Sequence, residues 1–308
     1  MHFTEIVSFL KKISNLTDID FYIVGGCIRD HILGKNNVDN LDITVINDFE
    51  GFLDIFIKTM KIERKSVKRS LFNTGIIEIN GLTIDIVTAR SEIYFSPGSL
   101  PRIFASDLET DLLRRDFTVN SIAYDVRSEK IIDPLKGRKD IENKIIRANR
   151  EKLFIEDPTR IFRYFKYKNR FSFIGEVETE KQIENALTNE YLFKNVSKFR
   201  ISKEWMLVLK EDRRGQIIEE IFKQGVLSRL FNDNVIYDIS SLLENDEKII
   251  TLKIFYNNKT ETLIKILDTL FNGIKKREDL LIRRMKSENN KFDLRRIESS
   301  FFTGNKQK

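Results

Sequence analysis

The strongest constraint on the fold is a glycine pair that directly follows a predicted strand. Residues 20–24 (DFYIV) have the aromatic and β-branched character of a strand, and Gly25-Gly26 end it. A helix is predicted to follow, at about Cys27–Leu33. Glycine at such a junction lets the backbone approach a ligand closely, and a helix start directs N–H groups at an anion. A tight turn with no ligand fits these residues equally well, although Arg29 could add a charge-assisted fork to a phosphate.

Alternating apolar patterns predict further strands in the first 135 residues. The Asn80-Gly81 pair separates two of them and is a strong hairpin signal. Helical patterns occupy residues 1–13 and Asp48–Met60. The sequence therefore predicts a small α/β unit built on one sheet. Its further strands are expected at Leu41–Ile46, Gly75–Ile79, Leu82–Thr88, Ile122–Val126 and Lys130–Asp133.

Helical periodicity dominates from Lys136 onward, with few prolines or glycines to interrupt it. This change of pattern predicts an all-α second part. The expected helices are Pro158–Arg170, Thr179–Leu187, Lys198–Leu209, Gly215–Gln224, Glu261–Leu270 and Lys275–Met285.

Charge is distributed unevenly along the 308 residues. Residues 1–140 carry 19 basic and 21 acidic side chains, whereas residues 141–308 carry 34 and 26. A basic second part is typical of a protein that holds a polyanion, although solvated helix faces give the same pattern. The only cysteine is Cys27, so a reducing compartment such as the cytoplasm is expected. We expect no membrane span, because no apolar run approaches the required length.

Two aspartates lie on predicted strands in positions suited to metal binding. In both Leu41–Ile46 and Leu82–Thr88, alternation places the aspartate, Asp42 or Asp85, on the face opposite its apolar neighbours. Carboxylates from adjacent strands, with a third nearby, would hold two divalent cations that clamp a phosphoryl group. Aspartates that simply face solvent are the alternative for each residue taken singly.

A basic stripe is predicted on the helix that begins at Pro158. Arg160, Arg163 and Lys166 recur every three residues, and Asp157 lies at the helix start. Basic side chains on a helix whose other face is buried need either a ligand or an acidic partner. Both interpretations remain open at the level of sequence.

Four motifs, taken in order, resemble the class II tRNA nucleotidyltransferases, which are the CCA-adding enzymes and their bacterial poly(A) polymerase relatives. The resemblance covers about residues 20–170, including a linker-like stretch at Ile132–Ala148. The matching residues are Gly25, Gly26, Arg29 and Asp30; Asp85 in IDIVTAR; Arg114, Arg115, Asp116, Phe117, Thr118 and Asn120; and Glu156, Asp157, Arg160 and Arg163.

The resemblance implies a role for each matching residue. It implies that Gly25, Gly26 and Arg29 hold a nucleotide triphosphate, and that Asp42 binds magnesium while Asp85 helps to activate the primer 3′ hydroxyl. It further implies that ribose and phosphates are contacted by Arg114, Arg115, Asp116 and Asn120, and that the base is read by Asp157 and Arg160 with help from Arg163 and Lys166.

The implied fold is α+β, with a nucleotidyltransferase head on a small mixed sheet followed by an all-α neck and body. The implied boundaries are 1–135 for the head, 136–171 for the nucleotide-selecting neck and 172–308 for a tRNA-binding body. The implied activity is template-independent addition of CCA, or part of it, to tRNA from CTP and ATP, with two Mg²⁺ ions. CC-only addition, A-only addition and poly(A) synthesis share these motifs, and no obligate protein partner is expected.

One departure from the family pattern concerns the metal site. The family expects Asp-x-Asp, and the preferred alignment puts Asn40 at the first position and Asp42 at the second. Asp39 would then have to bulge inward to supply a carboxylate, because Asn40 could coordinate magnesium only weakly. The other registration makes Asp42 the first position and Thr44 the second. This ambiguity also motivates a different hypothesis, a catalytically weak RNA-binding relative.

A second departure is a helical part shorter than the family usually carries. Its basic stretches could grip RNA phosphates, and they lie at Lys198–Lys210, Lys275–Lys286 and Leu294–Phe302. Core packing is the favoured prediction for Trp205 and for Phe301-Phe302, ahead of base stacking.

Overall fold

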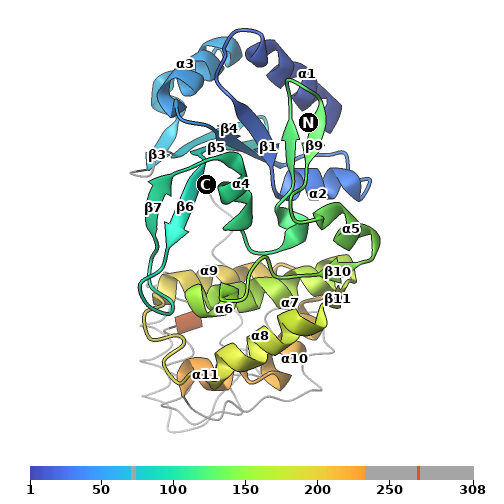
Figure 1. The fold of residues 1–308 in the computed structure, drawn as a ribbon, viewed down its shortest axis with the longest axis vertical. Coiled ribbons are helices and arrows are strands. Elements are labelled where there is room, and N and C mark those ends of the chain that lie inside the picture. The colour runs from blue at the N-terminus through green and yellow to red at the C-terminus, as the bar shows by residue number, and fades with distance from the viewer. Residues whose placement is uncertain (71–73, 233–268, 271–308) are drawn as a thin grey trace, which may run out of the picture. The chain divides into compact units, whose positions relative to one another are not determined.

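The computed structural model describes residues 1–70, 74–232 and 269–270, and the chain divides into two compact units (Figure 1). Unit 1 comprises residues 1–95, 100–153 and 174–179. Unit 2 comprises residues 96–99 and 154–173 together with the chain from residue 180 onward. Each unit is described by itself below.

A seven-stranded mixed sheet forms the centre of unit 1. The β2 and β5 strands pair in parallel, and every other neighbouring pair in this sheet is antiparallel. The predicted small mixed sheet is therefore confirmed. Its strand order is β3 (Lys68–Ser70), β4 (Thr74–Ile79), β5 (Leu82–Thr88), β2 (Asn40–Val45), β1 (Phe21–Val24), β8 (Ala123–Asp125) and β9 (Lys130–Ile132).

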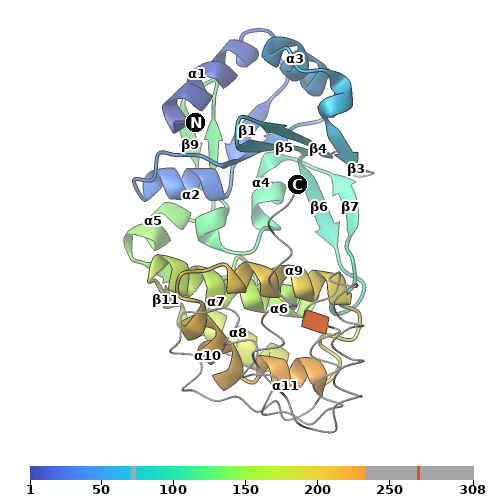
Figure 2. The same ribbon diagram turned by 180° about the vertical axis from the view of Figure 1, so that it is seen from behind.

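Helices α1 (Phe3–Ser14) and α3 (Phe49–Met60) cover one face of this sheet (Figures 1 and 2). The Phe21 ring of β1 lies 4.6 Å, centroid to centroid, from the Phe52 ring of α3. Because side chains alternate along a strand, Val24, three residues after Phe21, is turned to the other face. The face of β1 that carries Phe21 therefore packs on the α1–α3 side.

The opposite face of the sheet carries α4 (Leu108–Leu113), where Leu112 packs against Val24 and Ala123 in a buried cluster. The remaining elements of unit 1 are short. They are α2 (Gly26–Ile32), α5 (Gly137–Glu142), the 3-10 turns η1 (Arg64–Ser66) and η2 (Thr118–Asn120), the hairpin β6 (Arg90–Ile93) and β7 (Arg102–Ala105), and the parallel pair β10 (Ile145–Ile146) and β11 (Ile174–Gly175). The sequence pattern did not predict the β6–β7 hairpin, because its residues are mostly polar or exposed.

The described part of unit 2 is built from helices, as the sequence predicts. The Phe162 ring of α7 meets the Trp205 ring of α9 edge to face at 6.5 Å, and Trp205 is only 1% exposed, which confirms its predicted place in the core. The helices are α6 (Leu153–Glu156), α7 (Thr159–Phe171), most of α8 (Val177–Thr188), α9 (Lys198–Leu209), α10 (Arg214–Lys223) and α11 (Val226–Phe231).

Several predicted segments fall largely or wholly outside the described residues. Of the helix expected at Glu261–Leu270, only Thr269 and Leu270 are described, and both are helical. The segments Lys275–Met285, Lys275–Lys286 and Leu294–Phe302, with Phe301-Phe302, lie outside the described range. Among the helices that the structure does describe, none has the length and apolarity needed to cross a lipid bilayer.

A close backbone contact joins α5 to η2, and it generates a stability prediction. A Cβ atom on Gly137 would lie 2.2 Å from the Thr118 carbonyl oxygen. Because that oxygen belongs to the backbone, Gly137→Ala should force η2 away and cost about 1–3 kcal/mol in the free energy of unfolding. Chemical denaturation would measure this change. Lys139→Ala, on the exposed side of the same helix, is the control, and an equal effect of the two changes would contradict the prediction.

Candidate functional site

Asp42 and Asp85 lie side by side on one face of the sheet in unit 1. They are direct partners in the parallel ladder between β2 and β5, and both are half-buried. Asp42 is also the antiparallel partner of Val24, whose side chain faces α4 rather than the α1–α3 layer. The two carboxylates therefore project from adjacent strands on the side opposite the main core, as strand alternation predicts.

The structure places Asn40 on the face that carries Asp42. β2 begins at Asn40, two residues before Asp42, so the two side chains share a face. Asp39 precedes the strand, and its carbonyl oxygen accepts a hydrogen bond of 2.8 Å from the Thr83 amide. Within the described range, no group of three or more acidic, histidine or cysteine side chains could hold a metal ion. The inward bulge of Asp39 stays a prediction, whereas Asn40 lies within the strand that carries Asp42.

Thr44, the second acid position in the other registration, is fully buried. Its hydroxyl oxygen accepts a hydrogen bond of 3.3 Å from Nη2 of Arg115. Thr44 therefore supports an arginine on the face of the sheet that also carries Asn40, Asp42 and Asp85.

Gly25 allows an arginine and a carboxylate to meet across the turn between β1 and α2. Its φ of 75° is in the region that favours glycine, and its amide donates to the Ile122 carbonyl at 3.0 Å. A Cβ atom at Gly25 would lie 3.1 Å from Nη1 of Arg115 and 3.5 Å from Oδ2 of Asp42. The glycine therefore leaves open the space between these two charged groups.

Arg29 is bound to protein acceptors. It is 4% exposed, donates through Nε and Nη2 to Asp30 at 2.9 Å, and donates through Nη1 to the side-chain oxygen of Asn120. Asn120 in turn donates to Oδ1 of Asp116 at 3.0 Å. Arg29, from the motif of the glycine pair, thus fixes Asn120, from the motif that begins at Arg114. The sequence could not show this relation, because 91 residues separate Arg29 from Asn120.

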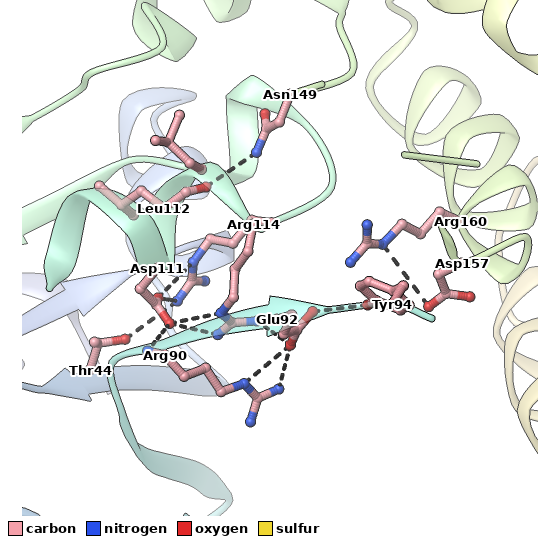
Figure 3. A network of polar contacts seen from close by, with 12 residues as sticks. Thr44, Arg90, Glu92, Tyr94, Asp111, Leu112, Arg114, Asn149, Asp157 and Arg160 are labelled. Carbon is pink, nitrogen blue, oxygen red and sulfur yellow. Dashed lines mark hydrogen bonds and ion pairs between the residues drawn. The ribbon is translucent and has the colours of Figure 1, made fainter. Parts of the chain in front are cut away.

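A carboxylate that the sequence analysis did not select lies beneath the arginine pair Arg114–Arg115. Asp111 is completely buried and accepts hydrogen bonds from both guanidinium groups (Figure 3). Glu92 accepts from Nη1 of Arg114 at 2.9 Å and pairs with Arg90. Burial raises the pKa of Asp111, but Arg115 and Arg114 outweigh it, so the net pKa is lowered and the carboxylate stays charged. The sequence signal was available, because Asp111 in the last turns of α4 precedes the two arginines by three and four residues, which is helical spacing.

In unit 2, Asp157 is held through one of its two carboxylate oxygens. Oδ1 accepts from the Thr159 amide at 3.0 Å and from its hydroxyl at 2.6 Å, and it lies 2.7 Å from Nη2 of Arg200. Oδ2 has a longer contact, 4.0 Å from Nε of Arg160 (Figure 3). Burial raises the pKa of Asp157, but the positive charges of Arg160 and Arg200 lower it by more. The net pKa is therefore below the ordinary value.

Arg200 was not among the residues selected from sequence. Its Nη1 donates to the Gly98 carbonyl at 2.7 Å, so the same guanidinium holds Asp157 and the turn at residues 96–99. Gly98 is required there, since its φ is 71° and a Cβ atom would lie 2.6 Å from Cγ2 of Val196. No local pattern marks Arg200, because its partners lie 43 residues away or more.

The basic stripe on α7 has acidic and aromatic partners. Lys166 is 3% exposed, and its Nζ lies 3.6 Å from Oε2 of Glu204 and 5.0 Å from the centre of the Tyr167 ring. Arg163 is half-buried, with its guanidinium 6.0 Å from the same ring. For Lys166, the alternative of an acidic partner is therefore the one that the structure shows.

Cys27, which follows the glycine pair, gives a reactivity prediction. It is 6% exposed, and its burial, reinforced by Asp42 and Asp30, raises the pKa of the thiol to about 12. Since the thiolate is the reactive form, we expect almost no reaction with a disulfide reagent at pH 8 in the folded protein. Full reaction should follow unfolding in guanidinium chloride. As Cys27 is the only cysteine, absorbance of the released thiol reports on this site alone, and rapid labelling of the folded chain would contradict the prediction.

Comparison with known proteins identifies relatives that match most of this chain. A family model described as the poly A polymerase head domain matches residues 21–147. The A-adding tRNA nucleotidyltransferase of Geobacter sulfurreducens is 32% identical over 83% of this chain and 29% of its own length. The CCA-adding enzyme of Ligilactobacillus salivarius is 30% identical over 94% of this chain and 68% of its own length. The chain thus spans less than a third of the A-adding relative and about two thirds of the CCA-adding one.

Solved structures give the same result at the level of the fold. A CCA-adding enzyme in an apo form superimposes with a TM-score of 0.77 at 25% identity, covering 92% of this chain and 70% of the other. A CCA-adding enzyme in complex with ATP gives a TM-score of 0.71 over 92% of this chain and 70% of the other, also at 25% identity. A tRNA-processing enzyme with CTP gives 0.73 over 90% and 78%, again at 25% identity.

Proposed function

The chain belongs to the family of class II tRNA nucleotidyltransferases, and from this premise we propose that it adds nucleotides from CTP, ATP or both to tRNA 3′ ends. The addition needs no nucleic-acid template. The observation that carries the proposal is the in-register pairing of Asp42 with Asp85 beside the Gly25 turn. The ATP and CTP complexes of similar solved enzymes support the choice of nucleotides.

The donor set in unit 1 fits Mg²⁺, which the family implies. Asp42 and Asp85 supply two carboxylates from adjacent strands, and Asn40 supplies an amide oxygen on the same face. Hard divalent cations prefer such oxygen ligands. When bound, the ions would neutralise the charge that develops on the phosphoryl oxygens during transfer. Asp42 and Asp85 would be the principal ligands, with Asn40 a weaker one.

The reaction would form one bond and break one. The 3′ oxygen of the RNA attacks the α-phosphorus of the nucleotide, and the bond from that phosphorus to the pyrophosphate oxygen breaks. Asp85, half-buried beside Asp42, would accept the proton from the 3′ hydroxyl. The free energy for this step comes from the nucleotide triphosphate, so no other reactant is needed.

The polar network of unit 1 would orient the nucleotide. Arg114 and Arg115 would bind the triphosphate and ribose through their forked donors. Asp116 and Asn120 would contact the sugar, and Arg29 would act on them indirectly through its hydrogen bond to Asn120. Gly25 and Gly26 would allow the phosphates to approach the backbone closely.

Base selection is assigned to unit 2, where Asp157 and Arg160 are near one another at the start of α7. Because Oδ1 of Asp157 already accepts from Thr159 and lies within ion-pair distance of Arg200, Oδ2 is the oxygen suited to accept from a base amino group. Arg160 supplies donors for the neighbouring acceptor on the pairing edge of cytosine or adenine. Arg163 and Lys166 would assist by packing against Tyr167.

The division of labour follows the family pattern. Residues 1–135 would form the catalytic head, 136–171 the nucleotide-selecting neck, and 172–308 a body that holds tRNA in the cytoplasm.

A-only addition is the second candidate, and the 32% identity to the Geobacter sulfurreducens A-adding enzyme favours it. CC-only addition and poly(A) synthesis use the same groups, whereas an RNA-binding relative with weak catalysis would bind nucleotide without turnover.

A product ladder tests the activity. Transcribed tRNAs ending at the discriminator base, at CC or at CCA would be incubated with the protein, Mg²⁺ and labelled CTP, ATP or both. We expect one to three added nucleotides, with UTP and GTP poorly used.

Asp85→Asn should lower the rate constant at least about 1,000-fold at saturating nucleotide, because it removes one charge from the metal site. The control is Asp54→Asn, on the exposed side of α3. Asp30→Asn is not suitable, because Asp30 pairs with Arg29 of the proposed site.

Absence of incorporation into any of these tRNAs, with nucleotide still bound, would contradict the enzymatic proposal and favour the RNA-binding alternative. Extension from the discriminator base by C alone, or from CC by A alone, would identify the specialised activities.

The amide at position 40 gives a gain-of-function prediction. Asn40→Asp adds a third carboxylate on the face of Asp42 and Asp85, so we expect Mn²⁺ to bind about tenfold more tightly at neutral pH. Titration followed by the electron paramagnetic resonance signal of free Mn²⁺ would measure this. Asp39→Asn, which removes a neighbouring charge from outside the strand, should change the affinity by less than threefold. A larger effect at position 39 than at position 40 would contradict this assignment.

A further inference from the structure

Two consecutive residues, Asn149 and Arg150, close the C-terminal end of α4, and neither has a role in the mechanism above. Nδ2 of Asn149 donates to the Leu112 carbonyl at 3.2 Å (Figure 3). Nη1 of Arg150 lies within hydrogen-bond distance of the next three carbonyls along the chain, which are those of Leu113 at 3.2 Å, Arg114 at 2.7 Å and Arg115 at 3.2 Å. Two side chains from outside the helix therefore bind four consecutive backbone acceptors.

Asn149 also holds the rest of segment 112–121, and all of these contacts lie within unit 1. Its Nδ2 donates to the Ser121 hydroxyl at 2.6 Å, and its amide donates to the Asp116 carbonyl at 3.0 Å. The segment is thus fixed at both ends and near its middle. It carries the four side chains to which the proposed function assigns contacts with ribose and phosphates, namely Arg114, Arg115, Asp116 and Asn120.

The position of the arginine pair depends on the backbone at this helix end. Arg114 and Arg115 follow Asp111 by three and four residues, so both reach its carboxylate only while the last turn keeps helical geometry. The last carbonyls of a helix have no partner within it, and a helix of six residues is too short to hold its own end. Asn149 and Arg150 supply the missing partners, and the charge of Arg150 is favourable at a helix C-terminus.

We propose that Asn149 and Arg150 are positioning residues for nucleotide binding. By satisfying the carbonyls at the end of α4, they fix the backbone from which Arg114 and Arg115 reach the triphosphate. This inference rests on the proposed function for the contact between the two arginines and the phosphates. In this role Arg150 acts through the backbone, which experiment can separate from direct binding of a phosphate.

Binding of CTP to the full chain, with Mg²⁺ and without RNA, tests the proposal. Arg150→Met removes the donors and keeps a long side chain, so the last turn should loosen and the dissociation constant for CTP should rise about tenfold. Arg150→Lys keeps the charge and a donor, and should stay within about threefold of the unmodified chain. Equilibrium dialysis with labelled CTP would measure the dissociation constant, and circular dichroism would check the folding of each variant.

A double-mutant cycle separates positioning from direct contact. In an Arg115→Gln background, where one of the positioned arginines is already lost, Arg150→Met should weaken CTP binding by no more than about threefold. A residue that bound the phosphates itself would show its full effect in both backgrounds. Arg115→Gln should fold, because Arg114 still pairs with Asp111 and the new amide can donate to the same carboxylate.

Arg127→Met is the matched control. Nη2 of Arg127 also donates to a backbone carbonyl of unit 1, that of Thr17, at 2.9 Å, but neither residue belongs to segment 112–121. This change should leave the dissociation constant for CTP unchanged. If Arg150→Met does not fold, Asn149→Ala takes its place, with an expected loss of about three- to tenfold that again shrinks in the Arg115→Gln background.

Hydrogen exchange and nucleotide addition give two further readouts. Backbone amides of residues 112–121 should exchange faster in Arg150→Met, whereas a loss of CTP affinity with unchanged exchange would overturn the proposal. In the addition assay, Arg150→Met should raise the KM for CTP about tenfold and change kcat by less than about threefold.

Unchanged CTP affinity in folded Arg150→Met, or an equal loss in the Arg115→Gln background, would also overturn the proposal. A chain that binds CTP but adds no nucleotide would refute the proposed activity alone, and the comparison of affinities would still hold. A chain that binds no CTP would overturn both.

Discussion

The parallel pairing of β2 with β5 is the constraint on which the rest of the candidate site depends. A shift of one residue between these strands would turn the Asp42 side chain away from Asp85 and put it into the α1–α3 core. The register is fixed by burial, since Leu41, Ile43, Ile84 and Ile86 must all face that core while their neighbours face the other way. The hydrophobic energy of the core therefore sets the distance between two carboxylates that do not belong to it.

The face opposite the core is organised by ion pairs between arginines and buried acids. Asp111 and Glu92 hold Arg90 and Arg114, and Asp111 also holds Arg115, so the guanidinium groups do not have to be ordered when a ligand arrives. Ordering a long side chain on binding costs about 0.5–1.5 kcal/mol, and pre-organised donors avoid that cost. The lowered pKa of Asp111 has the same origin, because two adjacent cations stabilise its charged form despite burial. The network fixes the direction of these guanidinium groups on the face that carries Asp42.

Unit 2 repeats this arrangement with different residues. Asp157 is fixed by Thr159 and Arg200 on one oxygen, and Arg200 also binds the backbone of Gly98. A carboxylate with one oxygen anchored in this way has a defined direction, which the proposed reading of a base would need. In both units, a residue expected from its motif to meet the ligand is oriented by a charged residue that no motif contains.

The sequence by itself determined the β-then-α order, most strand and helix positions in the described range, the two aspartates and the family. These features depend on local periodicity and on residues close together in the chain, which a linear reading captures. It did not predict the β6–β7 hairpin, the hydrogen bond from Arg29 to Asn120, or the roles of Arg200 and Glu92. It left open whether Asn40 belongs to the strand that carries Asp42. Only the tertiary structure decided these points, because they depend on ladder register and on contacts between side chains far apart in sequence.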